Sequence, residues 1–210
     1  LNNLNKKGFT HVKCLGELIS NSIDAKAKKI VIKNSKDITS IIDDGYGMTE
    51  DKISDMFSMY RSNHLNDKSH GVSGLGGKAS LKLLSDNQNI TILTKHKDGD
   101  YLCVSVPWED MIKKGAYSNM INVTKMNQEN QQFWKEQTYS DTGTLIILPT
   151  TSKLINTLKQ QFIDYKELEN PNDRLDCMFG KYHNLDIEYF DYENPSKPIL
   201  LNKYNPLGGE

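Results

Sequence analysis

Three side chains that carry oxygen atoms stand at helical spacing near the start of the chain. Glu17, Asn21 and Asp24 occupy positions i, i+4 and i+7. On a helix with about 100° per residue they fall within roughly 60° of arc. Such a stripe supplies a carboxylate that can accept a proton, an amide oxygen that can bind a metal ion, and a second carboxylate as a polar anchor. A solvated helix face without lysine accounts for the same pattern, so this segment alone leaves both interpretations open.

A second group of polar residues follows a short apolar run. Residues 43–48 read DDGYGM and come directly after the hydrophobic segment 38–42. A plain turn explains aspartate and glycine at this point. A buried strand that delivers the Asp43 carboxylate to its own C-terminal end would also position a ligand contact, and the sequence leaves both readings open.

Glycines dominate a third segment, from Gly71 to Gly77, where four of seven residues are glycine. This density predicts a mobile loop, because glycine weakens both helices and strands. A P-loop would require glycine at position 72 and serine or threonine at position 79, and the chain has Val72 and Ala79. A dinucleotide fingerprint would require a buried strand before the glycines, but residues 67–70 are polar.

The hydrophobic pattern predicts the elements that must position these groups. We expect helices at 12–26, 49–60, 78–85 and 152–168, and strands at 30–32, 38–42, 89–95, 101–106, 142–148 and 185–190. The first helix would pack on a sheet through Val12, Leu15, Ile19 and Ile23, which lie opposite its polar stripe. Residues 107–140 are predicted as a polar connection with a candidate strand at 120–124, and residues 174–182 as a helix or strand.

Composition narrows the class of protein. The 210 residues are 37% hydrophobic and 25% charged, with a formal net charge of −1. These values indicate a soluble globular protein without a global electrostatic preference for nucleic acid or membrane, although a local basic patch stays open. Three scattered cysteines without a C-x-x-C pair argue against a disulfide framework or a structural zinc site and favour an intracellular compartment. No apolar run approaches the roughly 20 residues of a membrane span.

The order of the motifs resembles the GHKL superfamily, the ATPase fold shared by DNA gyrase, the large heat-shock chaperones, histidine kinases and MutL. The resemblance covers residues 12–148 and ends with Gly143-Thr144 before an apolar strand. It implies an α+β fold: a two-layer α/β sandwich of the Bergerat type, with a mixed, mostly antiparallel sheet and helices on one face. ATP would lie between the helices and the glycine-rich segment.

The resemblance also implies a role for each motif residue. Glu17 matches the general base that activates water, Asn21 the ligand of Mg²⁺, and Asp43 the acceptor of the adenine amino group. The remaining nucleotide contacts that it implies are Asp24 at the nucleotide's edge, Gly47 and Met48 in the pocket wall, Thr144 behind the adenine, and the lid residues Gly71, Gly74, Leu75, Gly76 and Gly77. Lys78 is either a phosphate contact or a solvent-facing lysine at a helix start.

Within the superfamily, the lid is most similar to that of MORC chromatin ATPases. Gly77 and Ala79 depart from that pattern, which has an aromatic residue and a serine there. The similarity implies slow Mg²⁺-dependent ATP hydrolysis coupled to lid closure, an ATP-dependent homodimer in a longer form of the chain, a nuclear location, and contact with DNA or chromatin through other domains. MutL-, topoisomerase- and chaperone-type ATPases stay open, as does a nucleotide-gated binding module without significant turnover.

We expect two regions in the chain. Residues 1–150 would form the ATP-binding domain, and residues 151–210 a helical connection and the start of a following, transducer-like domain. Because the chain begins with Leu1 and its first helix follows within about ten residues, we also expect that the sequence is a shortened one.

Overall fold

The computed structural model describes residues 10–58, 73–114 and 120–203. In chain order the elements are α2 (His11–Asp24), β1 (Lys29–Asn34), β2 (Ile38–Asp43), α3 (Glu50–Ser58), α4 (Ser73–Leu84), β3 (Ile90–Lys95), β4 (Tyr101–Val106), α5 (Trp108–Lys114), β5 (Asn122–Lys125), α6 (Gln128–Gln137), β6 (Gly143–Pro149), α7 (Ser152–Phe162), α8 (Leu175–Phe179), β7 (Asp186–Phe190) and β8 (Ile199–Leu200), with short 3₁₀ turns at Tyr165–Glu167 and Pro171–Asp173.

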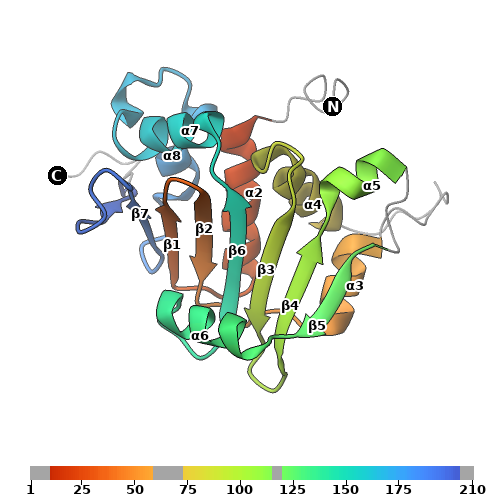
Figure 1. Cartoon of the computed structure of the whole chain (residues 1–210). Helices are drawn as coiled ribbons and strands as arrows, with labels where there is room; N and C mark the ends of the chain where they lie inside the picture. Colours follow the sequence, from red (N-terminus) through yellow and green to blue (C-terminus); the bar gives the residue numbers. More distant parts are fainter. Residues whose placement is uncertain (1–9, 59–72, 115–119, 204–210) are drawn as a thin grey trace, which may run out of the picture.

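One sheet runs through the molecule in the order β5-β4-β3-β6-β2-β1-β7-β8 (Figure 1). Among the described strands, only β1 and β7 pair in parallel; the other neighbours are antiparallel. The mixed, mostly antiparallel α/β architecture that the motifs predicted is therefore confirmed. Strands β6 and β2 lie in the middle, so the polar residues at the ends of these strands are held by neighbours on both sides.

Helices cover both faces of the sheet, unequally. The main core joins α2, α3 and α4 to one face and contains Leu15, Ile19 and Ile41. The opposite face has a smaller core in which Trp134 of α6 packs with Ile42 and the strands beside it. In Figure 1, α6 crosses in front of the lower part of the sheet while α2 lies behind it. Because successive strand residues point to opposite faces, Ile41 of β2 enters the main core and Ile42 the smaller one.

Residues 107–140 contain more structure than the sequence predicted. The segment expected to be a connection holds two helices, α5 and α6, beside the short edge strand β5. Each helix is anchored by one buried tryptophan, Trp108 or Trp134, both 1% exposed. Asn127 also caps α6 by accepting a hydrogen bond from the Asn130 N–H at 2.7 Å. In α6 a single large side chain thus supplies the packing that the polar composition concealed, while α5 also buries Met111.

The glycine-rich prediction also needs correction. We expected a loop through residue 77 and a helix from Lys78, whereas α4 begins at Ser73 and includes Gly74, Gly76 and Gly77. The predicted helix at 152–168 is shorter than expected, since α7 ends at Phe162 and a 3₁₀ turn follows. The segment 174–182 contains the helix α8.

The region after residue 150 adds to the same sheet. Strand β7 pairs in parallel with β1, in a register that joins Ile32 to Tyr189. Helix α7 packs beside α2 through Leu154 and Leu158, which belong to the main core. The domain boundary at residue 150 stays a prediction. No helix in the described ranges is long and apolar enough to span a bilayer.

Candidate functional site

A cavity of about 330 Å³ lies between the helices and the sheet. This volume falls at the lower end of the range of small-molecule pockets, which is about 300–1,000 Å³. Its wall includes residues of α2, the end of β2, the segment after β2, α3, α4 and the central strands: Leu18, Asn21, Ser22, Asp24, Ala25, Asp43, Gly47, Met48, Lys52, Asp55, Met56, Gly77, Ile92, Thr144 and Ile146. Seven of the residues predicted from the motifs, including Thr144, therefore line one cavity.

Asp43 is the buried acid of this cavity. It is 8% exposed at the end of β2 and lies opposite Thr144 in the register with β6. The Ser22 hydroxyl donates a hydrogen bond to Asp43 Oδ2 at 3.2 Å, and the Gly45 N–H donates to Oδ1 at 2.9 Å. Burial raises the pKa of Asp43 to about 6, although both hydrogen bonds lower it. The carboxylate is consequently held in place and ionises near neutral pH.

A hydroxyl on β3 fixes the segment that follows β2. Thr94 accepts a hydrogen bond from the Met48 N–H at 2.8 Å and donates one to the Gly143 carbonyl at 2.9 Å. Its hydroxyl also lies 3.4 Å from that of Thr144, the register partner of Thr94 on β6. Sequence reasoning missed Thr94 and Ser22. The available signal was weak: each is a hydroxyl residue in an otherwise apolar face or strand.

Gly47 allows that segment to lie against the sheet. Its φ is +69°, and a Cβ there would lie 2.6 Å from the carbonyl carbon of Lys95. Both the conformation and the space require glycine. Together with Met48, Gly47 lines the cavity, at the position that the motif predicted for a pocket wall.

Helix α4 contains glycines because it approaches α2 closely. A Cβ on Gly76 would lie 2.5 Å from Glu17 Oε2, and a Cβ on Gly77 would lie 3.1 Å from Asn21 Nδ2. The two glycines thus leave room for the two polar side chains of α2 that matter most for the predicted chemistry. We call this contact between Gly76-Gly77 and Glu17 with Asn21 the α2–α4 seam. Close packing rather than flexibility explains the glycines, and this corrects the predicted loop.

The polar stripe of α2 is divided by this seam. Asn21 is half-buried and lines the cavity, and Asp24 is exposed at its edge. Glu17 is exposed and lies against Gly76, outside the set of residues that line the cavity. The stripe is therefore one face of one helix, as its spacing predicted, with a carboxylate just beyond the cavity.

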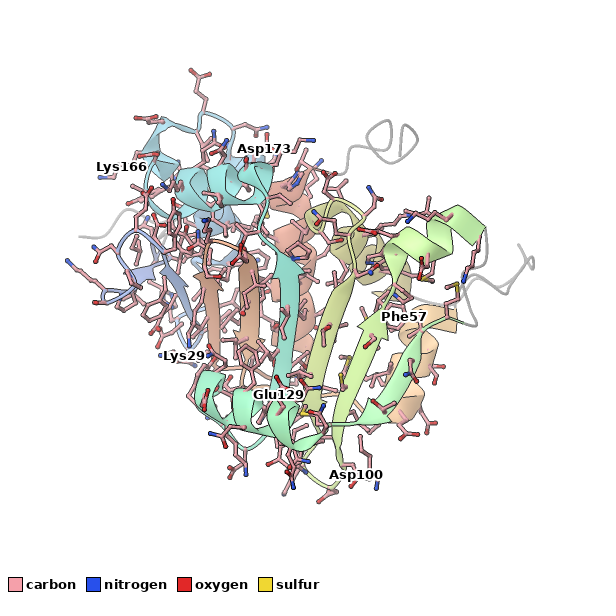
Figure 2. The ribbon with its side chains drawn as sticks, in the orientation of Figure 1. Lys29, Phe57, Asp100, Glu129, Lys166 and Asp173 are labelled. Carbon is pink, nitrogen blue, oxygen red and sulfur yellow. The ribbon has the colours of Figure 1, made fainter. Side chains whose placement is uncertain are left out.

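Lys78 is buried, and the expectation of a solvent-facing lysine is wrong. It is 4% exposed, and its Nζ donates to the Phe57 carbonyl at 3.0 Å. Figure 2 labels Phe57 on α3. A phosphate contact by Lys78 stays a prediction. Of the other lid residues, Gly74 and Leu75 lie in the first turn of α4, and Gly71 lies outside the described residues.

Helix α3 contributes cavity residues that sequence reasoning did not single out. Lys52, Asp55 and Met56 lie on the wall, one helical turn apart. Thr49 accepts a hydrogen bond from the Lys52 N–H at 3.3 Å, which is the contact that an N-cap residue makes. The i, i+3 and i+4 spacing of Lys52, Asp55 and Met56 was the signal, because these positions share one face of a helix.

A buried acid at the end of a central strand and an amide on the facing helix thus line one cavity of an α/β sandwich. The family model described as "Histidine kinase-, DNA gyrase B-, and HSP90-like ATPase" matches residues 10–144. The chain belongs to this family of ATPase domains.

One solved structure similar to the chain is an Aquifex aeolicus MutL ATPase domain complexed with ADP, with 13% sequence identity and a TM-score of 0.47. The match covers 92% of this chain and 64% of the MutL chain. No curated protein matches the sequence.

Proposed function

We propose that this domain binds ATP together with Mg²⁺ and hydrolyses it slowly. The observation that carries the proposal is the buried Asp43 carboxylate, fixed by Ser22 and Gly45 at the wall of a cavity that Asn21 also lines. A carboxylate accepts hydrogen bonds only, so it suits the amino group of adenine and disfavours the carbonyl that guanine presents there. Thr144, opposite Asp43 in the sheet, adds a hydroxyl on the same side.

Asn21 fits the role of a magnesium ligand. Its side chain lies in the cavity wall, in the room left by the missing Cβ of Gly77. Mg²⁺ prefers oxygen ligands and retains several waters, so one protein oxygen is sufficient when phosphate oxygens provide others. When bound, the ion neutralises charge on the phosphates. Asn21 would hold it beside the carboxylate of Asp24.

Glu17 is proposed as the general base. Its carboxylate lies on the same helix face as Asn21, one turn earlier, in the room that the missing Cβ of Gly76 leaves. From there Glu17 would orient a water and accept its proton during attack on the terminal phosphate. Gly76, Gly77 and the first turn of α4 would face the phosphates, because helix N-termini favour anions.

A nucleotide-gated binding module without significant turnover is the second candidate. It is favoured by one observation: Glu17 is exposed and lies beyond the residues that line the cavity. The discriminating experiment measures ATP binding by calorimetry and phosphate release, with and without Mg²⁺, for the natural sequence and Glu17→Ala. We expect Glu17→Ala to bind ATP and to lose hydrolysis. Equal phosphate release by both proteins would remove Glu17 as the base, and absence of release from both would favour the binding module.

The proposed contacts to Mg²⁺ and to adenine can be tested separately with two variants. Asn21→Ala should weaken Mg·ATP more than metal-free ATP, whereas Asp43→Asn should weaken ATP and ADP alike and relax the preference for adenine over guanine. Calorimetry with each nucleotide, with and without Mg²⁺, tests this. Equal losses in both variants for every ligand would contradict the two separate roles.

We further propose that the domain works as a MORC-like, ATP-dependent dimer in the nucleus, with DNA or chromatin contacted through other domains. The support is the similarity of the segment from Gly71 to Lys78; MutL-, topoisomerase- and chaperone-type cycles are the alternatives. Lid closure on ATP would link nucleotide to the partner by mass action. Light scattering of a longer form of the chain with a non-hydrolysable ATP analogue, with ADP and without nucleotide tests the dimer. A monomer that binds the analogue tightly would refute it.

A further inference from the structure

Lys78 lies outside the set of residues that line the cavity, and it is the residue directly after the α2–α4 seam. Its side chain is buried and runs from α4 to α3, where Nζ donates to the Phe57 carbonyl at 3.0 Å. Phe57 lies in the last described turn of α3, where helix carbonyls and the dipole favour a cation. The ammonium also lies 5.8 Å from the centroid of the Phe57 ring. Two helices that wall the cavity are thereby joined by one side chain.

Burying a lysine costs free energy because its ammonium group loses contact with water, so the burial of Lys78 needs a physical explanation. Burial and the neighbouring charge of Lys82 lower the pKa of Lys78 to about 8, which still leaves most of the ammonium charged at neutral pH. A charged donor on a carbonyl makes a stronger bond than a neutral one. Phe57 in turn packs on Trp108 of α5, with ring centroids 6.5 Å apart. Phe57, whose carbonyl Lys78 binds, is therefore itself held in place by the core.

The position of α4 decides where the α2–α4 seam lies. Gly76 and Gly77 come immediately before Lys78, and an added Cβ would lie 2.5 Å from Glu17 at Gly76 and 3.1 Å from Asn21 at Gly77. A small shift of α4 away from α3 would change the space available to those two side chains. Met56 of α3 also faces Gly77, at 3.5 Å from a Cβ built there, so all three helices meet at this point.

We propose that Lys78 is a positioning residue for ATP hydrolysis: by binding the Phe57 carbonyl it holds α4 against α3, and Gly76 of the α2–α4 seam then sets the room in which Glu17 is oriented. This inference rests on the proposed function of Glu17 as the base. Lys78 acts through the seam and contacts no reacting atom. Removing it should lower turnover and leave nucleotide affinity nearly intact, because a displacement of about 1 Å at a reacting group can cost on the order of a hundredfold in rate.

The test compares Lys78→Met, which keeps the length of the stem but cannot donate, with Lys78→Arg, which can. Lys82→Met is the matched control, since Lys82 lies one turn later on α4 and its Nζ lies 5.9 Å from the centroid of the Trp108 ring. We expect Lys78→Met to reduce kcat by about tenfold to a hundredfold with the Kd for ATP within about twofold of the natural sequence. Lys78→Arg should restore much of the rate, and Lys82→Met should hydrolyse ATP normally.

Double-mutant analysis shows whether Lys78 acts through Glu17. In a Glu17→Ala background the further change Lys78→Met should have little effect on residual turnover, because the group that it positions is absent. If Lys78→Met does not fold, Lys78→Gln replaces it, because its neutral amide ends one bond short of the lysine ammonium, and the same split between kcat and Kd is expected.

Four results would overturn the inference. Normal turnover in Lys78→Met would do so, while a selective loss of ATP over ADP affinity would make Lys78 a phosphate contact instead. Equal losses of rate and melting temperature in Lys78→Met and Lys82→Met would reduce its role to general stability of α4. If the natural sequence binds ATP and releases no phosphate, hydrolysis itself has failed and the positioning role falls with it; in the first three cases hydrolysis stands.

Discussion

Replacing Gly76 by alanine should separate catalysis from stability. The new Cβ would lie 2.5 Å from Glu17 Oε2 and 3.1 Å from its Cδ, whereas ordinary contacts begin near 3.4 Å. The carboxylate must therefore move by roughly 1 Å, a displacement that can lower a rate on the order of a hundredfold. Glu17 is exposed and can rotate, so relief of the contact costs little folding energy. Alanine in the helix should instead stabilise the fold by about 0.5–1 kcal/mol.

Gly16→Ala is the matched control for this change. Gly16 also lies inside a helix, α2, but a Cβ there would meet Met178 Sδ at 3.6 Å, an ordinary contact. Both variants should raise the melting temperature by a few degrees at most. Only Gly76→Ala should reduce phosphate release, measured at saturating ATP. If Gly76→Ala hydrolyses ATP within about twofold of the Gly16→Ala rate, Glu17 is either not the base or not positioned by α4.

Further predictions concern the inner part of the cavity. Asp43 has a folded-state pKa of about 6 against an ordinary 3.8, so the native state binds a proton more tightly than the unfolded chain. Stability should therefore fall as pH rises from about 4 to 6, by up to about 3 kcal/mol, and Asp43→Asn should abolish this dependence in urea titrations. ATP affinity should show the opposite trend, weakening below pH 6 as the carboxylate is protonated, and calorimetry at pH 5 and 7 checks it. Gly143→Ala should cost more than about 1 kcal/mol, because its φ is +138° and a Cβ would lie 3.0 Å from the Asp43 carbonyl carbon; a melting temperature equal to the natural one would contradict this. Thr94→Val leaves the Met48 N–H without its acceptor and should cost about 1–3 kcal/mol, whereas Thr94→Ser should be tolerated in the same thermal melts.

Much of the fold could be predicted because its central elements have strong local patterns. The antiparallel hairpins β1–β2 and β3–β4 are apolar runs joined by short turns, and both are present. Helix α6 could not be predicted in this way. Its sequence, QENQQFWKEQ, is mostly polar, and the helix is held on the sheet by the buried Trp134, which meets Leu145 and the strands around it. One anchor gives no periodicity, so the pattern was read as a connection.

The candidate site also contains residues that could be predicted from the sequence and residues that could not. Asp43 and Asn21 could be found because the expected chemistry demands a carboxylate and an amide at set positions. Ser22 and Thr94 could not, because a small hydroxyl is equally compatible with a core, a surface or a strand edge. Their roles depend on register: Thr94 supports Met48 only because β3 pairs with β6 so that Thr94 stands opposite Thr144. Contacts across strands are absent from any local pattern.

The glycines of α4 show why composition alone misled. Glycine has two distinct uses, backbone freedom and the absence of a Cβ, and a sequence does not reveal which of them applies. At Gly47 the positive φ of +69° requires the first. At Gly76 and Gly77 the second applies, since the helix continues through them and the space of two side chains is filled by Glu17 and Asn21. The proximity of α2 was needed to decide between them, and that proximity also turns a presumed flexible lid into a wall that constrains the proposed base.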